Sequence, residues 1–171
     1  MQQPDDHHGP IYHSPTYGPL TLDDLIERMF AFQQLRPDMG YHLLIGTDSM
    51  PGICGEAIMV TAMALQRVGN GGLYFWKRER FQHLMTLRQR IYQEALCSVE
   101  CAREFLAHPK ATGLLIGDLE IHVDIGHRGP TREMIKEIVG MVTAHGFPVK
   151  TKPHSVAAST IADRHTVSAY P

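Results

Sequence analysis

The chain has 171 residues, 43% of them hydrophobic, which is enough for one substantial core and too few for two ordinary domains. A formal net charge of −2 and a pI near 6.6 exclude a global field that would attract nucleic acid or an anionic membrane. Residues 1–9 carry charged and histidine side chains without an apolar run, which argues against a secretory signal or membrane anchor. We therefore expect a cytoplasmic protein with no membrane partner.

The N-terminal segment differs in composition from the rest of the chain. Residues 1–20 contain four prolines among scattered histidines and tyrosines, and such a segment cannot bury enough apolar surface to fold alone. We expect a flexible or draped proline-rich arm, followed by one domain over 21–171. Thr21 is a good N-cap for a first helix, whose apolar residues recur at helical spacing until Pro37.

Three strands are predicted next. Residues 41–45 form a short apolar run, typical of a buried strand, that leads into Gly-Thr-Asp-Ser and so presents Asp48 at its C-terminal end. Residues 57–68 are apolar on both alternating faces, as in a central strand. A glycine-rich turn over 69–72 then predicts an antiparallel return over 73–81.

The second half of the chain alternates helix and strand. Thr86 and Gln89 resemble a capping box, and good helix formers follow until Pro109. The later elements are predicted as a strand over 119–125, a helix over 130–146, a strand over 147–152 and a helix from 155. An antiparallel hairpin beside two crossover units predicts an α/β fold, in which helices flank a mixed five-stranded sheet of hairpin and parallel strands. Ribonuclease H has this order of elements, and several other α/β folds share it.

Acidic side chains fall in the C-terminal parts of two predicted strands, Asp48 in the first and Asp124 in the fourth. Ligands in open α/β sheets gather at such ends. If the two strands are neighbours, the carboxylates repel each other in a partly desolvated site, and both ionise only with a cation present. Mg²⁺, or Mn²⁺ in its place, suits hard oxygen ligands, so we predict a divalent-metal site.

Two further acids are candidates for the same site. Glu94 falls on the apolar face of the long predicted helix, where a charged carboxylate needs a partner. The metal is one such partner, and a salt bridge to Arg88 or Arg90 is the alternative. For the fourth position we prefer Asp163 in the last helix, which could instead be a solvated helix end, and His154 is its competitor.

Four short motifs surround these acids: Gly-Thr-Asp-Ser at 46–49, His-Val-Asp-Ile-Gly at 122–126, Lys-Pro at 152–153, and Ala-Ala-Ser with Ala-Asp-Arg between 157 and 164. Together they resemble the uncharacterised bacterial ribonuclease H-like family typified by YkuK, and the resemblance covers nearly the whole chain. It implies a ribonuclease H-like fold and a metal-dependent nuclease. In that family an acidic residue often follows Lys-Pro, where this chain has His154.

The resemblance also implies a mechanism, phosphodiester hydrolysis with two metal ions. In that scheme Asp48 bridges both ions, while Glu94 and Asp124 each hold one. Asp163 or His154 completes the second ion's ligands.

A basic and aromatic stretch suggests how nucleic acid, RNA or DNA, would be bound. Lys77, Arg78, Arg80 and Arg88 cluster near the aromatic residues 74–76, a composition that suits a phosphate backbone and stacked bases. A solvated edge strand protected by charge is the alternative. The leading hypothesis is a Mg²⁺-dependent nuclease, and the competing one is a non-catalytic ribonuclease H-like nucleic-acid-binding or scaffold module.

Overall fold

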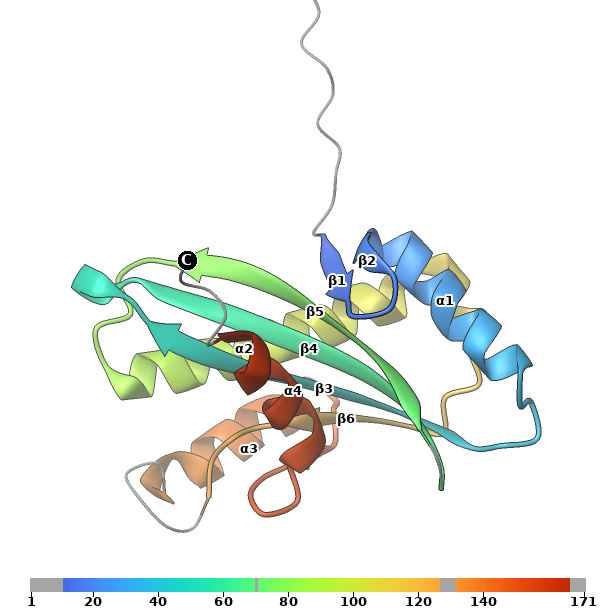
Figure 1. Ribbon diagram of the computed structural model, residues 1–171. Helices are drawn as coiled ribbons and strands as arrows, with labels where there is room; N and C mark the ends of the chain where they lie inside the picture. The colour runs from blue at the N-terminus through green and yellow to red at the C-terminus, as the bar shows by residue number, and fades with distance from the viewer. Residues whose placement is uncertain (1–10, 70, 127–131, 167–171) are drawn as a thin grey trace, which may run out of the picture.

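The computed structural model describes residues 11–69, 71–126 and 132–166, and of residues 156–159 the backbone alone. Within these residues the chain forms one seven-stranded sheet in the order β2-β1-β5-β4-β3-β6-β7 (Figure 1). The strands are β1 (Tyr12–Ser14), β2 (Gly18–Leu20), β3 (Tyr41–Pro51), β4 (Ala57–Arg67), β5 (Gly72–Phe81), β6 (Asp118–His122) and β7 (Val149–Lys150). The helices are α1 (Leu22–Gln34), α2 (Leu87–Ala107), α3 (Ile135–Ala144) and α4 (Val156–Thr166), with short 3-10 turns η1 (Ile53–Gly55), η2 (Pro109–Gly113) and η3 (Arg132–Met134).

The predicted α/β architecture is confirmed in its central part. The strands β3, β4 and β5 form an antiparallel meander; β6 pairs with β3 in parallel, and β7 pairs with β6 in parallel. Thr21 caps α1 and Thr86 caps α2, each within a full capping box, so both helices begin where the sequence predicts. The predicted C-terminal elements are longer than those observed, since β6 ends at His122 and β7 has only two residues.

Within the described residues, the sheet has seven strands rather than the five expected. The two additional strands lie in the described part of residues 1–20, which is ordered against the sheet. Two three-residue strands, β1 and β2, form an antiparallel hairpin, and His13 of β1 pairs with Trp76 at the edge of β5. Tyr12 is fully buried in the main core. A segment too poor in apolar residues to fold alone is thus ordered by pairing with the edge of β5 and by burial of Tyr12 in the main core. Residues 1–10 lie outside the described residues.

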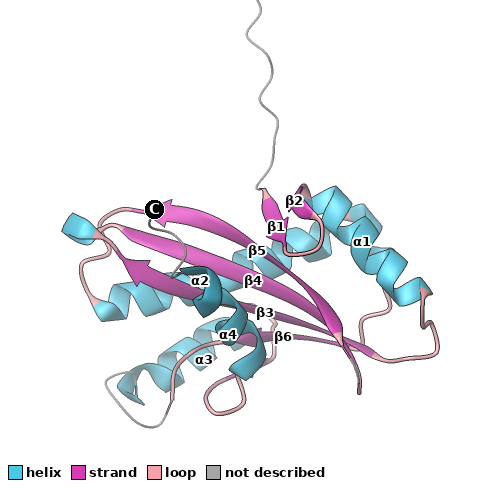
Figure 2. Cartoon of the chain, viewed as in Figure 1, coloured by secondary structure: helices cyan, strands magenta, loops and turns pink. Residues whose placement is uncertain are grey.

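Strand pleating sends alternate residues of β3 to two different helical layers. Tyr41, Leu43 and Ile45 face the main core. On this side of the sheet, α1, α2 and α3 pack their apolar residues against the strands. Leu44 faces the other side, where it packs with Ile161 of α4. In Figures 1 and 2, α4 crosses in front of the sheet and α2 passes behind it. Any residue of β3 therefore belongs to the α4 side or the α2 side according to its position along the strand.

Candidate metal centre

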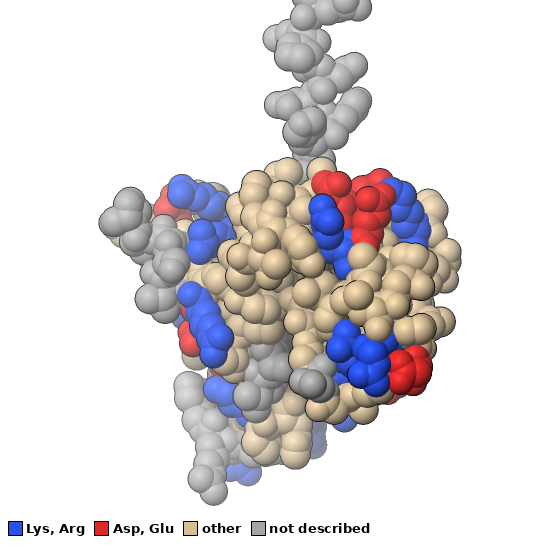
Figure 3. All heavy atoms as spheres, turned by 45° about the vertical axis from the view of Figure 1, so that its right-hand side comes forward, with Lys and Arg blue, Asp and Glu red and all other residues tan. Residues whose placement is uncertain are grey.

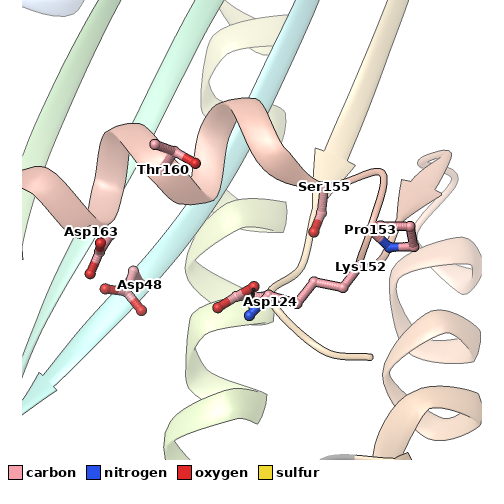
Figure 4. A pocket seen from close by; sticks show the side chains of 7 residues that line it. All are labelled: Asp48, Asp124, Lys152, Pro153, Ser155, Thr160 and Asp163. Carbon is pink, nitrogen blue, oxygen red and sulfur yellow. Dashed lines mark ion pairs between the residues drawn. The ribbon is translucent and has the colours of Figure 1, made fainter. Parts of the chain in front are cut away.

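The acidic pocket opens where two parallel strands part. Pairing between β3 and β6 ends at Gly46 and His122, and Asp48 and Asp124 each follow two residues later. The first predicted strand, 41–45, is too short, because β3 continues to Pro51 and Asp48 lies within it, paired with Val60 of β4. Asp124 follows the end of β6, and both carboxylates reach one opening where the parallel pairing stops. The pocket there measures about 420 Å³ (Figure 4). It is lined by Asp48, Asp124, Lys152, Pro153, Ser155, Thr160 and Asp163.

Asp48 and Asp163 meet across the pocket, one from β3 and the other from α4 (Figure 4). Burial raises the pKa of the Asp48 carboxyl, and the negative charge of Asp163 raises it further. The Thr166 hydroxyl donates a hydrogen bond of 3.3 Å to Asp48 Oδ2, and this contact works in the opposite direction. The pair therefore holds excess negative charge that a cation would relieve.

Asp124 has a cation beside it in the folded chain. The Lys152 ammonium lies 2.8 Å from Asp124 Oδ1 (Figure 4). About a third of the Asp124 side chain and more than half of the Lys152 side chain are exposed to solvent. At such exposure an ion pair contributes only about 0–1 kcal/mol to stability. The ion pair therefore adds little to the stability of the fold, and its main effect is on the charge of the acidic pocket.

Glu94 approaches from the α2 side of the sheet and does not line the pocket. Its side chain is buried, with 7% of the residue exposed, and Ser49 Oγ donates a 2.5 Å hydrogen bond to its Oε1. Burial raises the pKa of Glu94 to about 8, and the charges of Asp48 and Asp124 add to the effect. The alternative of a salt bridge to Arg88 or Arg90 is not observed in the described residues, where Arg88 contacts Glu137 instead.

A chain of buried hydroxyls holds this part of α2 against the sheet. Thr47 Oγ1 is 2.9 Å from Thr61 Oγ1 and 2.8 Å from Ser98 Oγ, and Ser98 donates to the backbone carbonyl of Glu94 at 3.1 Å. Because each hydroxyl can both donate and accept, the chain is satisfied without a charge. Thr47 and Ser49 face α2, while Asp48 between them faces α4. The three residues thus link both sides of the sheet to one site.

The four predicted substrate-binding residues are divided by the same pleating. Val60 pairs with both Asp48 and Arg78, so Arg78 lies in the same cross-strand row as Asp48, about 10 Å away over two strand spacings. Arg80 is exposed two residues further along the same side. Lys77 is buried on the α2 side, 3.3 Å from Glu104 Oε2. Arg88 lies on α2 and contacts Glu137, so the four do not form one surface.

The charge on the visible surface is mixed in sign. Figure 3 shows lysine and arginine side chains next to aspartate and glutamate side chains, rather than one continuous basic area on that face. Arg78 itself donates to the backbone carbonyl of His165, at 2.6 Å from Nη2 and 3.2 Å from Nε, which places a cation at the C-terminal end of α4. Arg78 therefore fastens the helix that carries Asp163.

The predicted acids are brought to one region but not to ligand spacing. Among the described residues, no group of three or more His, Cys, Asp or Glu side chains is arranged to hold a metal ion. Their oxygen donors nevertheless fit Mg²⁺ or Mn²⁺ in chemistry. Asp163 shares the pocket with Asp48 and Asp124, whereas His154 lines a second pocket beside His42 and His122.

Sequence reasoning assigned no role to three residues that contact the acids. Ser49 belongs to the motif Gly-Thr-Asp-Ser and Lys152 to the motif Lys-Pro, and membership of these motifs could have indicated that both residues lie at the site. Thr166 lies three residues after Asp163, one helical turn away, and its hydroxyl reaches Asp48. A polar residue next to a predicted ligand on a strand, or one helical turn from it, is thus a candidate for contact with the acids.

Comparison with known proteins defines the class. The ribonuclease H-like family model matches residues 24–167, and because this is most of the chain, the protein belongs to the ribonuclease H-like family. It is also 34% identical over 167 residues to the uncharacterized protein YkuK of Bacillus subtilis (strain 168), a match covering 91% of this chain and 96% of the relative. The resemblance inferred from the motifs is thereby confirmed. No solved structure gives a significant match. None of the helices within the described ranges is long and apolar enough to span a membrane.

Proposed function

We propose that the protein is a metal-dependent nuclease that hydrolyses phosphodiester bonds of RNA or DNA with Mg²⁺ or Mn²⁺. The observation that carries this proposal is the convergence of Asp48, Asp124 and Asp163 on one pocket, in a chain of the ribonuclease H-like family. Three carboxylates around one opening repel one another, and hard divalent cations are the partners that offset this repulsion best. Family membership supports a nucleic acid as the polyanion that the cations would bring to the pocket.

In this proposal each acid has a distinct role. Asp48, between the other groups, would contact both ions; Glu94 and Asp124 would each hold one, and Asp163 would complete the second. Such ions, when bound, activate a water molecule and stabilise the leaving 3′ oxygen. Before binding, the Ser49 hydroxyl holds Glu94 toward the strand that carries Asp48.

On the substrate side we propose a contact from Arg80, with Arg78 beside it already donating to the His165 carbonyl through Nε and Nη2. Both lie on the α4 side of β5, the side that Asp48 faces. Arg80 is exposed, so its guanidinium can contact a phosphate without a change in the fold. Lys77 and Arg88, which contact glutamates on the α2 side, fit this role poorly.

The decisive experiment is a cleavage assay with Asp48→Asn. The purified protein is incubated with RNA, DNA or their hybrid in Mg²⁺ or Mn²⁺, and the variant should lose cleavage while its circular dichroism spectrum stays unchanged. Asp118→Asn is the matched control, because Asp118 lies on β6 away from the pocket and pairs with His42. Cleavage that survives in Asp48→Asn, or no cleavage of any substrate by the wild type, would show that the proposed activity is wrong.

One observation favours a second candidate, a non-catalytic ribonuclease H-like nucleic-acid-binding or scaffold module. In the described residues the acids are not set at ligand spacing, and Lys152 already neutralises Asp124. Calorimetry with Mg²⁺ separates the two candidates. Binding that disappears in Asp124→Ala supports the metal centre, whereas a wild type without metal binding but with nucleic-acid binding supports the scaffold.

A further inference from the structure

Lys152 and Asp124, two of the residues that line the acidic pocket, form an ion pair with each other. Lys152 Nζ lies 2.8 Å from Asp124 Oδ1, an oxygen almost without solvent contact that receives no aligned hydrogen bond within the described residues. The ammonium ion is therefore what compensates this oxygen electrostatically. A second cation can reach the same oxygen only if the lysine moves aside.

The backbone around Lys152 holds it in this place. Its amide N donates to the Ile125 carbonyl at 2.9 Å, and the Val123 amide donates to the Lys150 carbonyl at 2.9 Å, so the parallel pairing of β6 and β7 continues past both strands. A Cβ at Gly126 would lie 3.2 Å from Lys152 Cβ, closer than most such contacts. The glycine thus leaves room for the lysine stem, and main chain and side chain both bring the ammonium to Asp124.

We propose that Lys152 is an internal counter-ion of the acidic pocket, which competes with a divalent cation for Asp124. This inference rests on the proposed metal-dependent function. Like charges repel, so the ammonium and a metal ion do not share Asp124 Oδ1. More than half of the Lys152 side chain is in solvent, and a pair so exposed is weak enough for a divalent ion to displace.

The consequence is that removing the lysine charge should strengthen metal binding. We expect Lys152→Met to bind Mn²⁺ up to about fivefold more tightly than the wild type, and at least about threefold, since an exposed ion pair is worth up to about 1 kcal/mol and tenfold corresponds to about 1.4 kcal/mol. Lys152→Arg keeps the charge and should stay closer to the wild type. In an Asp124→Asn background, Lys152→Met should have no effect.

The test is titration calorimetry of each purified protein with MnCl₂ at neutral pH, after circular dichroism has verified the fold. Lys150→Met is the matched control, because Lys150 is two residues away, similarly exposed, and paired with Glu120 in the other pocket. It should leave Mn²⁺ affinity unchanged. If Lys152→Met does not fold, Lys152→Gln takes its place.

The outcomes separate the inference from the function on which it rests. Tighter binding in Lys152→Met, or binding that appears only in that variant, supports it. If both proteins bind Mn²⁺ through Asp124 with affinities within twofold, or the variant binds more weakly, Lys152 is not a competitor, while the metal site stands. If none of the variants binds Mn²⁺, the proposed metal site fails together with the inference.

Discussion

Because the carboxyl of Glu94 is buried, we predict that the free energy of unfolding depends on its protonation state, which can be tested without a substrate. Burial raises its pKa from 4.5 to about 8, so the folded state keeps this group protonated at pH values where the unfolded chain does not. The stability contributed by the protonated carboxyl is fully present below about pH 4.5 and is lost as pH rises toward 8. Glu94→Gln imitates the protonated form and escapes this loss.

The magnitude follows from the size of the pKa change. A change of one in pKa corresponds to about 1.4 kcal/mol, so raising the pKa of Glu94 from 4.5 to about 8 sets an upper limit of about 5 kcal/mol. We expect Glu94→Gln to match the wild type near pH 5 and to be more stable by about 2–5 kcal/mol near pH 8, beyond which the difference levels off.

The assay is urea unfolding of both proteins between pH 5 and pH 9 with divalent cations chelated. Groups that titrate equally in both proteins cancel in the difference, so its pH dependence reports Glu94 together with the acids whose charges act on it, Asp48 and Asp124. Glu100→Gln, on the exposed side of the same helix, is the control and should follow the wild type at every pH. A difference between Glu94→Gln and the wild type that is constant with pH would refute the reasoning.

Two other predictions concern the pocket and the N-terminal hairpin. Asp163→Asn should lower the pKa of Asp48, because it removes the neighbouring charge that raises it; carbon-detected NMR titration of the Asp48 carboxyl measures this, and an unchanged pKa would contradict the contact. Tyr12→Ala should destabilise the protein by about 3–5 kcal/mol in urea unfolding, as expected for a fully buried aromatic side chain. Tyr17→Ala, at an exposed hairpin position, should cost far less, and equal losses would mean that the hairpin is not part of the core.

The sequence by itself was sufficient for features that depend on neighbours a few residues apart. Both capping boxes, at Thr21 and Thr86, and the apolar face of α2 with Glu94 on it are read from spacings of three or four residues. The position of Asp124 near the end of a strand follows in the same way from a short apolar run, whereas Asp48 lies inside β3, which continues to Pro51. The family motifs added that these acids belong together.

Only the tertiary structure decided features that depend on which strands pair and in what register. The docking of Tyr12 requires the free edge of β5, and the place of Arg78 in the same cross-strand row as Asp48 follows from the pairing of Val60 with both residues. Lys152 reaches Asp124 through backbone pairing between segments nearly thirty residues apart in the chain. Hydrogen-bonded register is a long-range choice, and a shift of one residue would turn each of these side chains to the opposite face of the sheet.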